Sequence, residues 1–111
     1  MDCTFCKIVA GDIPANLFYQ DEHVVAFPDI HPQAPTHLLV VPRRHVTSLW
    51  ELDDRVLAGA LLGAAAQVAR DADLARGWRL IANTGAEGGQ EVEHLHLHVL
   101  GGRPLGRMLP G

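Results

Sequence analysis

Short apolar runs separated by turn residues recur along this chain, and their spacing predicts several short strands. Five runs are rich in aliphatic and aromatic residues or alternate with polar ones, as strands do. They cover residues 16–20, 24–28, 37–41, 78–82 and 92–100. Two loops interrupt the pattern, one with two prolines at residues 29–35 and one rich in glycine at residues 83–90. We therefore expect a sheet of short strands joined by tight connections.

Two segments show helical periodicity instead. Residues 4–10 predict a short helix that ends at Gly11, and residues 54–75 predict a long one. An apolar stripe recurs along the long segment at helical spacing. Its members are Leu57, Leu61, Ala64 and Val68. Several strands with one long and one short helix predict a single α+β domain over residues 1–111, with a mostly antiparallel sheet.

Polar residues mark the expected helix ends. Either Asp53 or Asp54 can cap the start of the long helix. Arg76 followed by Gly77 is typical of a helix C-terminus. An S-x-x-E pattern at residues 48–51 has the form of a capping box and indicates a short helical turn just before the long helix.

Length, composition and charge narrow the class of protein. The chain has 111 residues, of which 48% are hydrophobic and 20% charged, as in one globular domain. Its apolar runs are far shorter than the roughly 20 residues of a membrane helix, and the N-terminus has no signal-peptide pattern. A net charge of −4 argues against a nucleic-acid backbone as ligand, but a small nucleotide needs only a local pocket of donors. We expect a cytoplasmic protein with neither a membrane nor a nucleic-acid partner.

The two cysteines, Cys3 and Cys6, form a C-x-x-C pair near the N-terminus. A disulfide there would close almost no loop and stabilise little, so a reducing compartment fits better. No predicted strand precedes the pair, which argues against a thioredoxin-like redox motif. Two cysteines supply only half of a tetrahedral zinc site, and two histidines would have to come from elsewhere.

Three of the seven histidines alternate in the last predicted strand, at His94, His96 and His98. Alternate side chains of a strand share a face, so the three imidazoles would line one face at a spacing of roughly 7 Å. Leu95 and Leu97 would face the core on the other side. Three neighbouring imidazoles disfavour one another's protonation, which makes a purely structural role a poor interpretation. A metal-binding ladder and a catalytic or ligand-binding face both stay open, and we favour the second.

The glycine-rich loop before these histidines favours a phosphate ligand. Gly85, Gly88 and Gly89 allow backbone N–H groups to approach an anion closely. Asn83 and Gln90 add amide side chains at the two ends of the loop. Because imidazole can attack phosphorus as a neutral nucleophile, loop and histidines together predict chemistry at a phosphate.

The segment H-L-H-L-H-V-L at residues 94–100 resembles the signature of the histidine triad (HIT) family. Further blocks, F-P-D-I at 27–30, P-Q-A-P-T-H at 32–37, G-G-Q at 88–90 and G-G-R at 101–103, resemble its Hint branch over nearly the whole chain. That branch contains nucleoside phosphoramidate hydrolases. The resemblance implies a five-stranded HIT-like fold whose sheet joins that of a second copy in a homodimer.

The resemblance also implies roles for particular residues. His96 matches the nucleophile that attacks the α-phosphorus and becomes a nucleotidyl-histidine, which water then hydrolyses to a nucleoside monophosphate. His98 matches a phosphate contact, His37 a histidine that supports proton transfer, and Asp29 the acid that binds both ribose hydroxyls. The remaining implied contacts are an apolar clamp for a purine base (Phe5, Ile8, Phe27 and Ile30) and phosphate-binding positions (Asn83, Gly89, Gln90 and Glu91).

Each of the nucleoside contacts also has a simpler interpretation from the residues alone. Asp29 and Asn83 could be turn residues, and the apolar clamp could be core. The sequence departs from the branch at Glu91, where many members have Ser or Thr, and at Glu93, where an aromatic residue is usual. Both changes bear on leaving-group preference. His23 and His31 match no family position and are expected at the surface.

Some family members carry zinc, and the resemblance implies four ligands here: Cys3, Cys6, His45 and His94. A closed four-ligand zinc site is structural, so the zinc would tie the N-terminus to the sheet. Two thiols without a metal are the alternative.

Three other functions compete with phosphoramidate hydrolysis. One is dinucleoside polyphosphate hydrolysis within the same superfamily, although G-G-R at residues 101–103 favours the Hint branch. Another is a nucleotide-sensing or partner-binding module with residual activity. A histidine-ligated metallohydrolase is the third, but few acids accompany the histidines.

Overall fold

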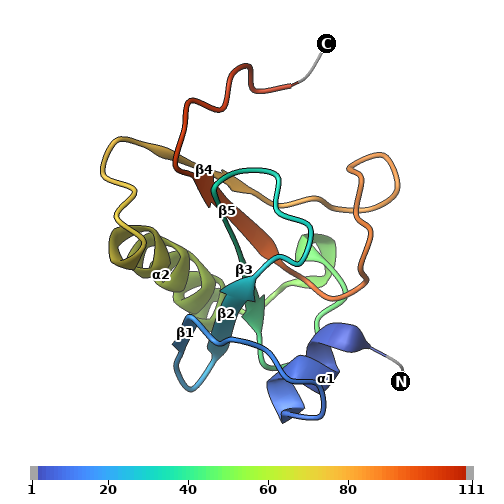
Figure 1. The fold of residues 1–111 in the computed structure, drawn as a ribbon. Coiled ribbons are helices and arrows are strands. Elements are labelled where there is room, and N and C mark those ends of the chain that lie inside the picture. The colour runs from blue at the N-terminus through green and yellow to red at the C-terminus, as the bar shows by residue number, and fades with distance from the viewer. Residues whose placement is uncertain (1–2, 110–111) are drawn as a thin grey trace.

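The computed structural model describes residues 3–109 and contains a five-stranded antiparallel sheet with strand order β1-β2-β3-β5-β4 (Figure 1). The expected HIT-like architecture is confirmed. The strands are β1 (Tyr19–Gln20), β2 (Val24–Pro28), β3 (Thr36–Pro42), β4 (Trp78–Ile81) and β5 (Leu97–Gly101). The helices are α1 (Thr4–Ala10), the 3-10 helix η1 (Leu49–Glu51) and α2 (Arg55–Asp71). Among the described residues, none of the helices is long and apolar enough to cross a membrane.

The two faces of the sheet bury different side chains. One face packs on α2, and this cluster includes the expected helix stripe together with Leu95, Leu97 and Val99. The other face buries a smaller cluster near α1, the helix that lies away from α2 across the sheet in Figure 1. Its members are Cys3, Phe5, Val25, Phe27, Leu39 and Val41. The strand alternation therefore separates a helix-covered core from the face that carries the histidines.

Helix α2 starts as expected but ends earlier than predicted. The Asp54 carboxylate accepts a hydrogen bond from the Leu57 N–H and caps the first turn. At the other end the chain turns at Asp73, with φ of 60°, rather than at Gly77. The backbone N–H groups of Asp73 and Leu74 bond back to the carbonyls of Arg70 and Ala69, which is a Schellman arrangement. Leu74 is buried in the α2 core, and this contact fixes the early end.

Two strands are shorter than the sequence predicted, and a proline limits each of them. In β1, residue 17 would face Pro28, which has no N–H to donate, so the ladder covers only Tyr19 and Gln20. In β5 the expected strand 92–100 begins only at Leu97. Its partner β3 ends at Pro42, whose carbonyl binds the His94 ring, so residues 92–96 leave the ladder. His94 and His96 therefore precede the strand instead of belonging to it.

The glycine-rich loop joins β4 to the histidine segment. Gly88 approaches the backbone of Thr84 so closely that a Cβ would lie 2.2 Å from the Thr84 carbonyl oxygen. Gly85 and Gly89 adopt φ of 70° and 77°, which side chains rarely tolerate. The expected tight loop is confirmed, and its shape needs glycine at these three positions.

Candidate functional site

The histidines meet on the face of the sheet that does not pack on α2. In the β3–β5 ladder, Leu39 faces His98 and His37 lies two residues before Leu39, so both imidazoles share this face. His96 follows in the same row, with its ring centroid 5.0 Å from that of His98. The sequence predicted the shared face, and the two rings approach more closely than the roughly 7 Å between alternate residues of an ideal strand because they tilt toward each other, with 65° between their planes.

His96 is buried, with 6% of its surface exposed, and its ring is held on two sides. Phe5 contacts it edge-on at 5.2 Å between ring centroids. Its Nδ1 lies 2.7 Å from the backbone carbonyl oxygen of His94. A carbonyl only accepts, so Nδ1 carries the proton and donates. In the neutral ring Nε2 therefore keeps a lone pair, which is the state that a nucleophile needs.

His37 and His98 form a pair. His37 Nε2 lies 2.9 Å from His98 Nδ1, and the Gln33 backbone N–H donates to His37 Nδ1 at 3.0 Å. Burial lowers the pKa of His98 to about 4, assisted by the neighbouring His96 and His37. Burial also lowers the pKa of His37, against the opposing charge of Asp29. Both rings are consequently neutral near pH 7.

Asp29 follows β2 directly and lies beside this pair. Its Oδ1 accepts the backbone N–H of His31, and its Oδ2 lies 3.5 Å from His37 Nε2. Ligand atoms of Asp29, His37 and His98 all lie within 4.8 Å, which is close enough to consider a metal. The Gln33 contact argues against one, since a neutral His37 ring that accepts at Nδ1 is protonated at Nε2 and has no lone pair there. Sequence reasoning missed Gln33, because it acts through its backbone.

The four expected base-clamp residues do not lie together in one environment. Phe5 and Phe27 are buried and meet edge-on at 5.5 Å between ring centroids. Ile8 is half-buried against the same cluster. Ile30 is 86% exposed. Both phenylalanines thus also serve as core, as the simpler interpretation held, while Ile30 offers its side chain to solvent.

The loop residues expected at a phosphate stabilise the loop itself. Asn83 donates to the carbonyl of Gly88 at 2.7 Å. The Gln90 side chain accepts the Gly85 N–H at 3.0 Å and donates to the Thr47 and Val92 carbonyls at 2.8 and 2.9 Å. Its amide donors are therefore engaged by protein carbonyls. The backbone N–H groups of Gly85, Gly89 and Gln90 are also engaged within the loop, so donors for an anion have to come from its other backbone N–H groups or from exchange of these bonds.

Glu91 and Glu93 are both exposed and lie in the segment between the glycine-rich loop and His94. His23 and His31 are also exposed, as expected from the sequence. Neither exposed histidine belongs to the row of imidazoles formed by His37, His96 and His98.

Cys3, Cys6, His45 and His94 form a second cluster, with one possible ligand atom from each residue within 4.8 Å of the others. The Sγ–Nδ1 distances are 3.3 Å for Cys3–His94 and 3.2 Å for Cys6–His45, and the two Nδ1 atoms are 3.1 Å apart. Tetrahedral zinc with bonds of about 2.0–2.3 Å has ligand separations of about 3.3–3.7 Å. The cluster is slightly contracted from this geometry.

The donor chemistry also fits zinc. His94 Nε2 lies 2.9 Å from the Pro42 carbonyl oxygen, so Nε2 donates its proton and Nδ1 faces the thiols with a lone pair. A metal-bound histidine commonly donates its other N–H to a backbone carbonyl in this way. The ring is fully buried. The residues present can therefore hold a zinc ion without rearranging the ring.

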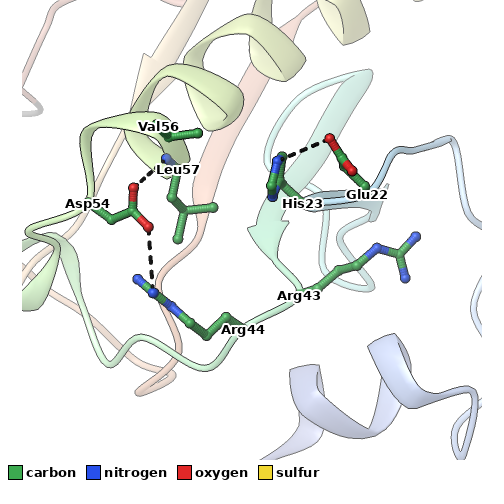
Figure 2. A pocket seen from close by; sticks show the side chains of 7 residues that line it. All are labelled: Glu22, His23, Arg43, Arg44, Asp54, Val56 and Leu57. Atoms are coloured by element: carbon green, nitrogen blue, oxygen red, sulfur yellow. Dashed lines mark hydrogen bonds and ion pairs between the residues drawn. The ribbon is translucent and has the colours of Figure 1, made fainter.

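A separate hollow of about 240 Å³ lies near the start of α2, outside the histidine face. Figure 2 shows its charged side chains and their ion pairs. Arg44 lies 3.6 Å from Asp54, and His23 lies 3.3 Å from Glu22. Arg43 points away and bonds the Asp21 carbonyl and Gln20. Arg44 pairs with Asp54, and His23 pairs with Glu22. The residues that line this hollow include one histidine and therefore form no row of imidazoles.

An antiparallel five-stranded sheet with a row of imidazoles beside a glycine-rich loop is the arrangement that the sequence resemblance implied. The family model for the HIT domain matches residues 10–105. The chain belongs to the HIT family.

Two kinds of relatives agree with this assignment. The purine nucleoside phosphoramidase of Escherichia coli K12 is 45% identical over 108 residues, which cover 95% of this chain and 91% of the relative. An uncharacterised HIT-like protein of Synechocystis is 46% identical over 106 residues, covering 94% of this chain and 93% of the relative. Among solved structures, a HIT family hydrolase from Legionella pneumophila has a TM-score of 0.92 at 43% identity, covering 99% of this chain and all (100%) of that one.

Proposed function

We propose that the protein hydrolyses the P–N bond of purine nucleoside 5′-phosphoramidates and releases a nucleoside monophosphate. The observation that carries this proposal is the hydrogen bond from His96 Nδ1 to the His94 carbonyl, which leaves Nε2 as a nucleophile. The similarity to a purine nucleoside phosphoramidase supports the substrate class.

In the first step His96 Nε2 forms a bond to the α-phosphorus, and the P–N bond to the amine breaks. The amine leaves with the bonding electron pair and takes up one proton from solvent water, while the N–H of the neutral His98 ring donates a hydrogen bond to a phosphate oxygen. The modified His96 ring carries positive charge, which the His94 carbonyl stabilises through the Nδ1–H. In the second step water attacks phosphorus, the bond from phosphorus to His96 Nε2 breaks with its electron pair returning to Nε2, and the attacking water releases one proton to solvent as the monophosphate leaves.

The remaining roles follow from position. The Glu91 backbone N–H would bind a phosphate oxygen, and the Gly89 N–H would do so by exchanging its bond to the Ala86 carbonyl, while the Asn83 and Gln90 side chains hold that loop in shape. The Asp29 carboxylate, which lies beside His37, would accept hydrogen bonds from the ribose hydroxyls. Phe5, Phe27 and Ile8 would form the inner wall of the base site, and Ile30 its exposed side.

The test compares adenosine 5′-phosphoramidate with diadenosine polyphosphate as substrates. His96→Ala should lower the rate on the phosphoramidate by at least about 10³-fold, because no other group replaces the nucleophile. His23→Ala, which changes an exposed histidine outside the row, is the matched control. Full activity of His96→Ala would refute the nucleophile. Faster cleavage of the polyphosphate would favour dinucleoside polyphosphate hydrolysis. Loss of activity in the presence of chelators would favour a metallohydrolase.

A covalent intermediate has its own test. Mass spectrometry of the protein quenched during turnover should show a nucleotidyl adduct on a peptide that contains His96. Trapping should fail in His96→Ala. An adduct on His98 or His37 would reverse the assignment.

We also propose that Cys3, Cys6, His45 and His94 hold one structural zinc ion per chain. The matching donor set and the Pro42 contact of His94 support this. Zinc would stabilise the attachment of α1 to the sheet. Metal analysis of protein purified without a histidine tag should give about one zinc per chain, and Cys3→Ala should lower it. A value near zero in both proteins would refute the site.

A homodimer and a cytoplasmic location complete the proposal. Two free thiols fit a reducing compartment. The β4 edge of the sheet pairs only with β5 within the described chain, and it could extend the sheet into a second copy. Light scattering at micromolar concentration should report twice the chain mass, and a mass of 12.0 kDa would contradict the dimer.

A further inference from the structure

We propose that the backbone amide of Gln33 fixes the tautomers of His37 and His98, so that Gln33 is a positioning residue for the phosphate-facing histidine. This inference deepens the proposed function, because it concerns the same histidine face. It rests on a hydrogen-bond chain that starts in the proline-containing loop between β2 and β3 and ends at His98.

The first step of the chain is the contact between loop and ring. The Gln33 backbone N–H donates to His37 Nδ1 at 3.0 Å. A backbone amide can only donate, so Nδ1 has to accept and bears no proton. In the neutral ring the proton is then on Nε2. Burial lowers the pKa of His37, which keeps the ring neutral at pH 7.

The second step passes this choice to His98. His37 Nε2 lies 2.9 Å from His98 Nδ1, and the protonated nitrogen donates to the bare one. The Asp29 carboxylate, at 3.5 Å from the same Nε2, attracts the same proton and supports the same tautomer. His98 therefore accepts at Nδ1 and carries its own proton on Nε2.

The consequence is a contrast between adjacent histidines. His96 is protonated on Nδ1 because it faces the His94 carbonyl, and its Nε2 is bare. His98 is protonated on Nε2 because it faces His37. One ring offers a lone pair for attack, and its neighbour, with centroid 5.0 Å away, offers an N–H donor for a phosphate oxygen. Two identical side chains thus take opposite roles, because His96 faces a backbone carbonyl and His98 faces a ring nitrogen of His37.

The loop that presents Gln33 is held in place by the end of β5. The Arg103 guanidinium donates to the Gln33 carbonyl at 3.2 Å. The Gln33 side chain donates to the His31 carbonyl at 3.0 Å. Gly102 lies so near Pro35 that a Cβ would be 2.9 Å from the Pro35 Cβ. Gly102 and Arg103 thereby support the loop that carries Gln33.

The test reads the tautomers directly by ¹⁵N NMR of the ligand-free protein at pH 7, because bare and protonated ring nitrogens differ widely in chemical shift. Single His→Gln variants assign the signals. We expect Nε2–H for His37 and His98 and Nδ1–H for His96. A His37 ring protonated on Nδ1 in the unmodified protein would overturn the proposal, whether or not any variant folds.

Two variants that remove the Gln33 N–H extend the test. Gln33→Pro and a backbone ester at position 33 should both give mixed tautomers at His37 and His98 and lower kcat at least tenfold, with a smaller change in KM. Gln33→Ala keeps the amide and should keep the tautomers. Unchanged tautomers in a folded ester variant would overturn the proposal. Tautomers as expected, without any phosphoramidate hydrolysis, would refute the proposed function and leave this inference standing.

Discussion

The glycine-rich loop offers a sharp test of the reasoning at Gly88. In Gly88→Ala the new Cβ would lie 2.2, 2.8 and 3.0 Å from the carbonyl oxygen, the nitrogen and the carbonyl carbon of Thr84. Real Cβ contacts essentially never fall below 3.0 Å, and the obstructing atoms belong to the backbone. A rotamer change cannot relieve this overlap, so the loop itself has to open.

The expected cost follows from the bonds that opening would break. These are Asn83 Nδ2 to the Gly88 carbonyl, Gly89 N–H to the Ala86 carbonyl and Gln90 N–H to the Gly85 carbonyl. Surface hydrogen bonds contribute about 0.5–1 kcal/mol each, so three amount to about 1.5–3 kcal/mol. For a domain of this size that corresponds to a Tm lower by about 8–15 °C.

The assay is thermal unfolding together with AMP binding by calorimetry, at equal protein concentrations. AMP affinity should fall at least about tenfold, because the backbone donors lose their arrangement. Gly59→Ala is the matched control, since Gly59 lies within α2 and nothing lies within 4 Å of its added Cβ. It should stabilise the protein by about 0.5–1 kcal/mol. An unchanged Tm and AMP affinity in Gly88→Ala would refute both the loop geometry and its phosphate role.

Three further predictions address the core, the acid response and the loop support. Leu61→Ala removes a buried side chain (2% exposed) and should lower the free energy of unfolding by about 2–5 kcal/mol in urea titrations, whereas Leu62→Ala (57% exposed) should cost less than about 1 kcal/mol. Burial alone would raise the pKa of the Asp21 carboxyl, but hydrogen bonds from the Tyr19 hydroxyl and from the His23 and Val24 backbone outweigh it and lower that pKa. As the pH drops, the unfolded chain therefore binds this proton before the folded chain does, so the free energy of unfolding should fall below about pH 4. In Asp21→Asn the free energy of unfolding, measured by urea titration, should depend less on pH in that range. Arg103→Met removes the donor to the Gln33 carbonyl and should lower kcat about two- to fivefold with little change in Tm; an unchanged kcat would contradict the support role.

Side-chain patterns predicted most of the fold, and backbone hydrogen bonding decided the differences. The α2 stripe and the alternation of Leu95, Leu97 and Val99 placed both halves of the main core correctly. The errors lie at element ends. Helix α2 ends at Asp71 because Asp73 adopts a left-handed conformation. Glycine usually occupies that conformation at a helix end, so the sequence pointed to Gly77 instead. Strand β5 begins at Leu97 because its ladder with β3 stops at the Val40–Leu97 pair, beyond which the Leu95 N–H bonds to the Val46 carbonyl, a contact that only the folded chain reveals.

The candidate site shows the same division between side-chain and backbone information. Parity along residues 94–98 predicted one face for the three imidazoles, and spacing along the chain could not predict that His94 turns to Cys3 and Cys6. That grouping came from the family resemblance, and the structure brings the four residues together. Ile30 matched the family pattern, but 86% of its surface is exposed. A match at one position does not predict which residues pack against that side chain.

What separates the chemistry of the histidines is invisible to any side-chain motif. The Pro42 carbonyl sets the proton of His94, the His94 carbonyl sets that of His96, and the Gln33 amide sets that of His37. All three partners are backbone groups, which a side-chain motif does not record. His94 therefore links the two clusters twice: its ring faces the thiols, and its carbonyl orients the ring of His96. A change that moves the N-terminal cluster should thus alter the nucleophile's tautomer as well as stability, because both depend on one residue's position.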